Sequence, residues 1–393
     1  MLAGRERAVA EIDLGAIRHN VRRLMRDLPE GAVCCAVVKA NAYGHGPVPV
    51  ARAALEAGAT WLGVAAVGEA EELRDAGLTA PILIFGAMTG AELERAAAAD
   101  ADVVGWSTPF VAAACRLGTP IHVKYNSGMG RLGVSPVEVI DLCQQAAAAG
   151  CLSGLMSHFA TADEPGATFF QLQLDRFTAL AAELKARYPH LLCHIANSAA
   201  TLRTQRSHFD MIRIGIAMYG LAPSNDDPFK DELRPVMKLS SYVAGVRDVQ
   251  PGDSVGYGRR FIADRPARVA IVPIGYADGV RRALTNRGEV LVAGRRCCIT
   301  GTISMDQLTV LLPDDWGMPG DEVVLFGAAG DGVSGRPDEP AWTGALGPRH
   351  DAWETPRILC EEVARLLSTI NYEVACDVAR RVTRRYRDVG PAV

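Results

Sequence analysis

Eight short apolar segments, separated by stretches of helical character, constrain the fold of this chain more than any other feature of its sequence. The segments are continuously apolar rather than alternating, as expected for parallel strands that are covered on both faces. Eight strands that alternate with helices predict a (β/α)8 TIM barrel. The candidate strands are residues 33–38, 61–66, 82–85, 102–106, 121–125, 152–159, 191–195 and 211–219.

An open, doubly wound sheet is the alternative fold for this repeat. Such a sheet would carry a Gly-rich phosphate turn directly after its first strand. Here Lys39, Ala40 and Asn41 occupy that place. The sequence therefore favours the barrel.

The pattern changes after about residue 239. Short strand-like runs follow, divided by turns such as Pro-Gly-Asp, and they predict a mostly β second domain. We place the barrel at residues 11–239 and the β domain at 240–393, with residues 1–10 as candidates to join the latter. A helix is predicted over 11–28 and another over 356–367. The stretch 327–355 has no period, and the sequence assigns it no role.

Composition excludes several classes of protein. The net charge of -4 and the pI of about 6.1 do not suggest a nucleic-acid partner. No apolar run approaches the roughly 18 residues of a membrane span, and the charged N-terminus lacks the apolar core of a secretory signal. The ten cysteines include no Cys-x-x-Cys pair and no zinc spacing. We expect a cytoplasmic protein without a structural metal.

Polar residues stand at the ends of several candidate strands, which is where barrel enzymes carry their chemistry. Each also has a structural interpretation: Lys39 suits a solvated rim position, Lys124 an ion pair, and Ser198 the start of a helix. Arg213 is hardest to explain in this way, because a buried guanidinium needs an acceptor. The strand-end residues are Lys39, Lys124, Asn126, Arg131, His158, His194, Asn197, Ser198, Arg213, Gly215 and Ile216.

One chemistry accommodates these residues together. A lysine forms an imine with pyridoxal 5'-phosphate, the cofactor that stabilises carbanions next to nitrogen. Ser198 and the backbone amides near Gly215 and Ile216 suit the cofactor phosphate.

Nine motifs then resemble those of one family, the alanine racemases. Residues 37–46 (VVKANAYGHG) resemble the family's cofactor-attachment signature over their whole length. The resemblance continues in the same order along nearly the whole chain, so it is highly specific. The other motifs are residues 124–133, 157–163, 194–198, 213–220, 256–259, 275–279, 304–307 and 370–373.

The resemblance implies a two-base reaction in a homodimer with shared active sites. Lys39 is one base and holds the cofactor, and Tyr257, supplied by the other subunit, is the second. Arg213 faces the pyridine nitrogen. The cofactor-binding residues that the resemblance implies are Lys39, Tyr43, His158, Ser198, Arg213, Gly215, Ile216 and Tyr372.

Further residues have implied roles. Arg131 and Met305 bind the substrate, and Lys124 corresponds to a lysine that is often N-carboxylated in the family. The supporting residues are Lys124, His194, Tyr276 and Asp306. Three features depart from the family pattern, and one is that the stretch 327–355 is longer than usual. Ser304 replaces a frequent cysteine, and Asn126-Ser127 replaces a commoner Asp-Thr, which puts the carboxylation of Lys124 in doubt.

The expected function is interconversion of L-alanine and D-alanine, which supplies D-alanine for peptidoglycan. A serine or broad-specificity racemase is the alternative of the same class. A non-catalytic pyridoxal-phosphate-binding protein resembles the barrel alone, so the second domain with Tyr257, Met305 and Tyr372 argues against it.

Overall fold

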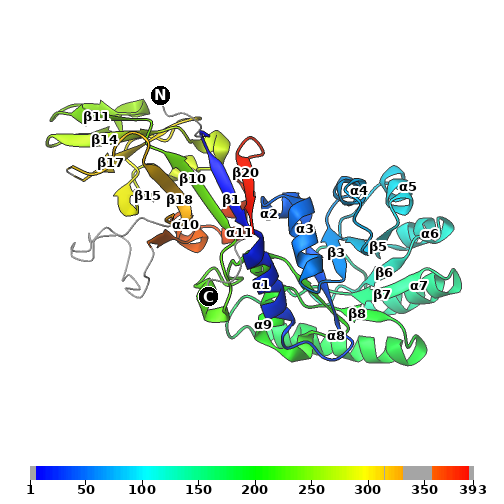
Figure 1. The fold of residues 1–393 in the computed structure, drawn as a ribbon. Helices are drawn as coiled ribbons and strands as arrows, with labels where there is room; N and C mark the ends of the chain where they lie inside the picture. The colour runs from blue at the N-terminus through cyan, green and yellow to red at the C-terminus, as the bar shows by residue number, and fades with distance from the viewer. Residues whose placement is uncertain (1–5, 314, 331–355, 389–393) are drawn as a thin grey trace. The chain divides into compact units, whose positions relative to one another are not determined.

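The computed structural model describes residues 6–313, 315–330 and 356–388, which form two compact units (Figure 1). One unit is Leu14–Val236, and the other combines residues 6–13 with Met237–Arg387. Most of the aperiodic stretch 327–355 therefore lies outside the described residues. None of the described helices is both long enough and apolar enough to cross a bilayer.

The unit Leu14–Val236 contains a nearly closed barrel of eight parallel strands. The strand order is β8-β7-β6-β5-β4-β3-β2-β9, and β2 pairs with β9. At the remaining seam the Arg213 N–H donates to Ala196 O at 3.1 Å. The strands are β2 (Val33–Val37), β3 (Trp61–Val64), β4 (Ile82–Ile84), β5 (Ala101–Gly105), β6 (Ile121–Lys124), β7 (Leu152–Met156), β8 (Leu192–His194) and β9 (Met211–Ile214).

Helices connect these strands, and their starts are readable in the sequence. At Thr89 and at Ser135 the hydroxyl caps the helix, and a glutamate three residues later accepts from the cap's own N–H. The helices are α1 (Leu14–Met25), α3 (Pro47–Glu56), α4 (Val67–Asp75), α5 (Gly90–Ala98), α6 (Thr108–Arg116), α7 (Pro136–Ala148), α8 (Thr168–Arg187) and α9 (Ser198–Arg203).

Side chains at alternate strand positions fill the barrel interior, as the strand period requires. One buried cluster joins Cys35, Leu83, Val104, Met156 and Met211, which come from five strands. Positions two residues away on the same strands therefore also face the interior.

The helix predicted over 11–28 is wrong at its start. Val9–Asp13 forms strand β1, and the helix begins at Leu14. The spacing of the apolar residues in β1 is compatible with a helix and with a strand. The strand forms because β1 pairs with β10 (Met237–Tyr242) on one side and with β20 (Thr383–Arg387) on the other. These ladders supply hydrogen bonds to residues distant in the sequence, which local periodicity cannot reveal.

The second unit is mostly β, as predicted. Its largest sheet has the order β16-β15-β18-β10-β1-β20, with β19 paired to β18, and a smaller sheet has the order β11-β14-β17. The remaining strands are β11 (Gly245–Val249), β12 (Ser254–Val255), β13 (Phe261–Ile262), β14 (Ala267–Val272), β15 (Glu289–Val292), β16 (Arg295–Cys298), β17 (Leu308–Leu312), β18 (Glu322–Ala328) and β19 (Arg357–Ile358).

Two late segments of this unit differ in detail from expectation. The helix predicted over 356–367 is shorter, because β19 adds to β18 before α10 (Cys360–Leu366) begins. Helix α11 (Asn371–Cys376) follows.

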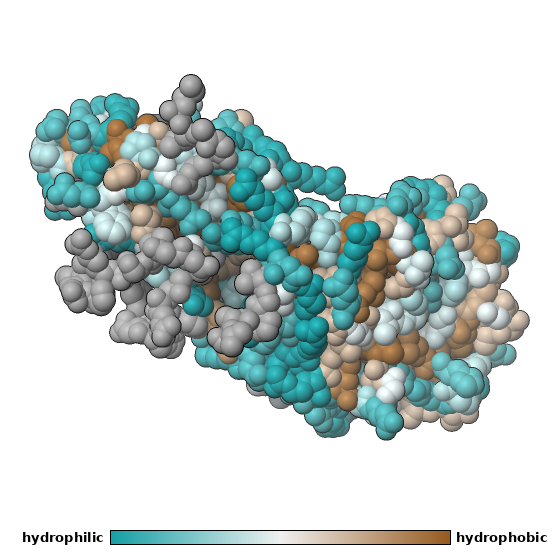
Figure 2. Space-filling view, in the orientation of Figure 1, coloured by the Kyte–Doolittle hydropathy of each residue, from teal (hydrophilic) through white to brown (hydrophobic). Residues whose placement is uncertain are grey.

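Hydrophilic residues cover much of the molecular surface in the view of Figure 2, with apolar residues in smaller groups.

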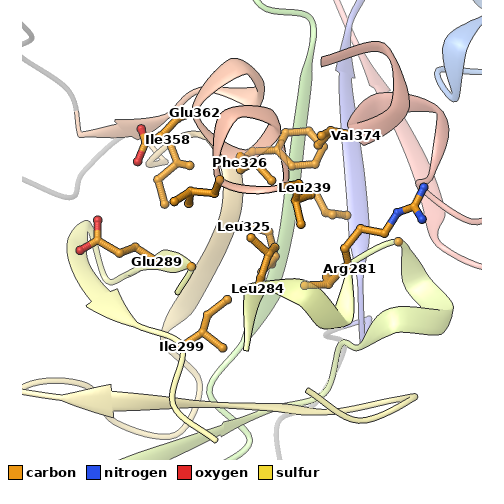
Figure 3. A pocket seen from close by; sticks show the side chains of 16 residues that line it. Leu239, Arg281, Leu284, Glu289, Ile299, Leu325, Phe326, Ile358, Glu362 and Val374 are labelled. Atoms are coloured by element: carbon orange, nitrogen blue, oxygen red, sulfur yellow. The ribbon is translucent and has the colours of Figure 1, made fainter. Parts of the chain in front are cut away.

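A pocket in the second unit is lined mainly by aliphatic side chains (Figure 3). Leu325 and Phe326 of β18 contribute to its wall. The carboxylates of Glu289 and Glu362 point away from its centre and bind Arg296 at 2.9 and 2.5 Å. None of the predicted site residues lines this pocket.

Candidate active site

The chain leaves β2 in a left-handed turn (α2 in Figure 1, Lys39–Tyr43). Ala40, Asn41, Ala42 and Tyr43 have φ values of 54°, 56°, 50° and 51°. Left-handed backbone costs an L-residue about 1–2 kcal/mol. Four such residues in succession persist only where the surroundings hold them, and such strain concentrates at functional sites.

Three side chains hold this turn. The Glu69 carboxylate accepts from the N–H of Ala40 at 2.6 Å and from two N–H groups after β3 at 2.8 and 3.1 Å. His45 Nδ1 lies 2.9 Å from Tyr43 O, and because a carbonyl only accepts, Nδ1 carries the proton. The Tyr219 hydroxyl donates to Val37 O at 2.9 Å. The Lys39 backbone is therefore fixed from both sides.

The exit of β9 forms a small cradle beside the turn. Gly215 N–H donates to Ser198 Oγ at 2.9 Å, and Ser198 begins α9 behind an Asn197 cap. A Cβ at Gly215 would lie 2.6 Å from Tyr43 Oη, so only glycine lets the hydroxyl approach. Ile216 is buried, and its N–H has no acceptor among the described residues. A buried backbone N–H without an acceptor is rare unless a ligand accepts its hydrogen bond.

Arg213 is the hub of the barrel mouth. It is 4% exposed and donates to His194 Nδ1 at 2.7 Å, Ser157 O at 2.8 Å, Ile195 O at 3.1 Å and His158 Nδ1 at 3.3 Å. Burial lowers the pKa of Arg213 to about 10, so it remains a cation at neutral pH. A guanidinium has no acceptor, so both Nδ1 atoms accept and both rings are neutral.

Positive charge gathers around His158. Burial, followed by the charges of Arg213, Lys124, Arg131 and Lys39, lowers the pKa of His158 well below its usual value. The charges of Lys39, Lys124, Arg131 and Arg213, four of the predicted strand-end residues, therefore act at one place, the ring of His158. Among the described residues, no ion pair joins Arg213 or Lys124 to a carboxylate. A site whose cationic side chains are not neutralised by carboxylates favours an anionic ligand.

Lys124 is buried beneath the loop that follows β6. Burial, then Arg213 and Arg131, lowers its pKa well below the usual value, which favours the neutral amine. Asn126 Oδ1 accepts from the N–H groups of Gly128 and Gly130 at 3.2 and 2.9 Å. An aspartate would make the same two bonds, so Asn126 preserves the loop that carries Arg131.

The other predicted residues lie in the second unit. Tyr257, Tyr276 and Met305 are 73%, 42% and 52% exposed, although backbone hydrogen bonds fix their loops. Thr302 Oγ1 donates to Tyr257 O at 2.7 Å, and the Tyr276 N–H donates to Ser304 O at 3.0 Å. Exposed aromatic and thioether side chains on a fixed backbone suit a surface that a partner covers.

A buried carboxylate organises the same region. Asp278 binds Arg7 and Arg381, and Arg381 also donates to Asp306 at 2.7 Å. Burial acts to raise the pKa of Asp278, but hydrogen bonds from Arg7, Gly275 and Arg381 outweigh it and lower the pKa. Tyr372 is the second residue of α11.

Comparison with known proteins places this arrangement in a family. The family patterns described as "Alanine racemase, N-terminal domain" and "Alanine racemase, C-terminal domain" match residues 12–223 and 236–341. The chain is 41% identical to the alanine racemase of Frankia casuarinae over 97% of this chain and 96% of that one. It is 42% identical to that of Thermobifida fusca over 96% and 98%.

This chain belongs to the alanine racemase family.

Solved structures of alanine racemases agree with this assignment. The alanine racemase of a D-cycloserine-producing Streptomyces lavendulae has a TM-score of 0.86 at 38% identity, covering 98% of both chains. The alanine racemase of Bacillus anthracis with bound L-Ala-P has a TM-score of 0.85 at 36% identity, covering 98% of this chain and 96% of that one. The family and fold predicted from sequence are confirmed, as is the assignment to an enzyme family.

Sequence reasoning missed several residues that shape this alanine racemase site. Glu69 holds the Lys39 turn, and Gln173 bridges Ser127 Oγ and His158 O, both at 3.1 Å. Asp102 and His122 extend the contacts of His194 into the barrel. A carboxylate or amide within a helix carries no sequence signal of such a role. A polar residue within an otherwise apolar strand was the available signal for the last two.

Proposed function

We propose that this chain interconverts L-alanine and D-alanine with pyridoxal 5'-phosphate, as a homodimer with shared active sites. The observation that carries the proposal is the cationic barrel mouth, where the charges of Lys39, Lys124, Arg131 and Arg213 act on His158, beside the cradle of Ser198 and Gly215. When bound, the cofactor supplies an electron sink that makes the α-proton of an amino acid removable. We also propose a cytoplasmic location and a role in supplying D-alanine for peptidoglycan.

The barrel residues fit the cofactor. Ser198, Tyr43, Gly215 and the Ile216 N–H would hold its phosphate, and this unpartnered amide supports that assignment. Arg213 would face the pyridine nitrogen. Because Arg213 only donates and stays charged, it cannot readily give the ring a proton. We infer that it limits charge delocalisation onto the ring and so favours reprotonation at Cα over transamination.

Two bases on opposite faces would move the α-proton. We assign them to Lys39 Nζ and to the phenolic oxygen of the partner's Tyr257. His158 supports the second role, because its Nδ1 accepts from Arg213 and its proton must therefore reside on Nε2. That Nε2–H can donate to a phenolate and so stabilise the form of the tyrosine that acts as a base.

The remaining residues position the substrate. Arg131 and the partner's Met305 would bind its carboxylate end. Tyr276 would belong to the mouth of the channel with Asp306 in support, and Tyr372 would help to hold the cofactor phosphate. A neutral Lys124 amine can add to carbon dioxide, forming an N–C bond and releasing one proton. Arg213 and Arg131, whose charges help to lower the pKa of Lys124, would stabilise the resulting anion.

A chiral assay tests the function directly. The purified chain with pyridoxal 5'-phosphate should convert L-alanine to an equal mixture of enantiomers, because enantiomers have equal free energies. Serine run in parallel separates a stringent from a broad racemase. Cofactor absorbance without any inversion would contradict the proposal and favour a non-catalytic cofactor-binding protein.

The phosphate cradle gives a separate prediction. Gly215→Ala places a Cβ 2.6 Å from Tyr43 Oη and forces that buried ring to move. Overpacking of this kind costs about 1–3 kcal/mol of folding free energy. We expect a lower melting temperature and weaker cofactor binding, measured by thermal unfolding and by titration of absorbance. Gly90→Ala is the matched control, since a Cβ there meets nothing within 4 Å. Equal cofactor affinity in both variants would exclude the cradle from phosphate binding.

A further inference from the structure

Four side chains form an unbroken hydrogen-bonded line through the barrel interior. Arg213 on β9 contacts His194 Nδ1 on β8 at 2.7 Å. His194 Nε2 lies 2.7 Å from His122 Nδ1 on β6, and His122 Nε2 lies 3.1 Å from Asp102 Oδ2 on β5. Both imidazoles are fully buried, whereas the Asp102 side chain is 14% exposed.

The chemistry of the two ends fixes the direction of every bond. A guanidinium only donates, so His194 Nδ1 accepts and its proton resides on Nε2. That proton is donated to His122 Nδ1, so the proton of His122 must be on Nε2. The line ends at the Asp102 carboxylate, whose Oδ2 is the acceptor for that proton. Each donor therefore points away from Arg213 and towards Asp102.

Packing shows that the fold makes room for this line. A Cβ at Gly154 on β7 would lie 2.3 Å from His122 Nδ1, so glycine is required beside the ring. The edge of Trp61 packs on His122 with ring centroids 5.6 Å apart. Asp102 is the second residue of its strand and Arg213 the third of its own. The line thus leads from the carboxyl-end site towards the opposite rim.

We propose that Asp102 is a positioning residue that acts on Arg213 through His122 and His194. Its carboxylate selects the Nε2–H tautomer of His122, which then selects the Nε2–H tautomer of His194. Only that tautomer presents a lone pair to Arg213. With the other tautomer, two N–H groups would face each other and Arg213 would turn away from its place in the site.

The catalytic part of this inference rests on the proposed function, because it assumes that Arg213 faces the cofactor ring. The tautomers themselves do not depend on that assumption. Which nitrogen of a histidine is protonated depends on the partner of the other nitrogen, so the prediction concerns a state that can be observed directly.

Nitrogen-15 NMR of the holoenzyme, labelled at histidine, tests the proposal. His122→Gln and His194→Gln variants assign the two rings. In the wild type, long-range proton couplings should show both rings neutral and protonated at Nε2. The side-chain amide introduced by Asp102→Asn can donate a hydrogen bond as well as accept one. His122 and His194 should then each become a mixture of the two neutral tautomers. Racemisation kcat should fall about tenfold, as for other partners that orient a functional histidine, with KM little changed.

Asp100→Asn is the matched control, because it removes the same charge two residues away. Asp100 is exposed, and asparagine tolerates its φ of 49°. Its spectrum and kcat should equal those of the wild type. A wild-type His194 protonated at Nδ1 would overturn the proposal, and this measurement needs no variant to fold. Wild-type tautomers and kcat in Asp102→Asn would also overturn it. Failure of the proposed function would instead leave correct tautomers without turnover.

Discussion

Tyr257→Phe is expected to slow racemisation by about 10²–10⁴-fold, the usual contribution of a general acid or base. The change removes only the phenolic oxygen. Because the side chain is 73% exposed and Thr302 Oγ1 binds the backbone oxygen of Tyr257, folding should be unaffected. Cofactor absorbance should therefore match the wild type, and chiral chromatography gives the rates in both directions.

Isotope exchange sharpens this expectation. In deuterated water the Tyr257→Phe variant should exchange the α-proton of only one alanine enantiomer, because Lys39 still serves one face. Tyr386→Phe is the control, since it removes the same atom from another exposed tyrosine, one without an assigned role in the site. It should exchange both enantiomers at rates within a few-fold of the wild type, as expected for a side chain outside the proton transfer. Equal losses in the two variants would remove Tyr257 from its role as a base.

Lys39→Ala is expected to abolish racemisation, because the proposed mechanism assigns to Lys39 both the covalent attachment of the cofactor and the role of one of the two bases. Lys230→Ala is the control, since Lys230 forms an exposed ion pair with Asp226 and such pairs contribute little to stability. The Lys230 variant should keep wild-type turnover and absorbance. Substantial inversion by Lys39→Ala would contradict the assignment of the site.

The two inactive variants together test whether the sites are shared. In a mixed dimer of Lys39→Ala and Tyr257→Phe chains, one site carries both substitutions and the other carries neither. Refolding an equal mixture should recover about one quarter of wild-type activity, since half of the dimers are mixed and each has one intact site. Mixing Lys39→Ala with Lys39→Arg should recover none. Equal activity in the two mixtures would show that each chain completes its own site.

The barrel was predictable because its signal is repeated. Each strand is apolar throughout and each connection is helical, so one misread boundary changes little. Strand β1 was not predictable in the same way. Val9, Ala10 and Ile12 are buried, and their ladder partners in β10 lie more than two hundred residues away in the sequence. No window of local sequence contains those partners.

The site divides similarly between predictable and hidden features. Lys39, His158 and Arg213 stand at strand ends, where topology alone brings them together. The left-handed turn was hidden, because its residues Ala40–Tyr43 include no glycine to signal a positive φ. The contact of His122 with Asp102 was also hidden. It depends on which strand positions face inward and on Gly154 leaving space, and both require the assembled barrel.

The position of β1 has a consequence for the order in which the chain folds. β1 lies between β10 and β20 in its sheet, so one of the first segments to be synthesised is completed by one of the last. Leu14–Val236 is continuous and can collapse while synthesis proceeds. By contrast, the pairing of β1 with β20 closes a loop of nearly the whole chain, and strand pairings so distant in sequence form slowly. A nascent chain should therefore carry a folded barrel with β1 paired on its β10 side only, until β20 has left the ribosome.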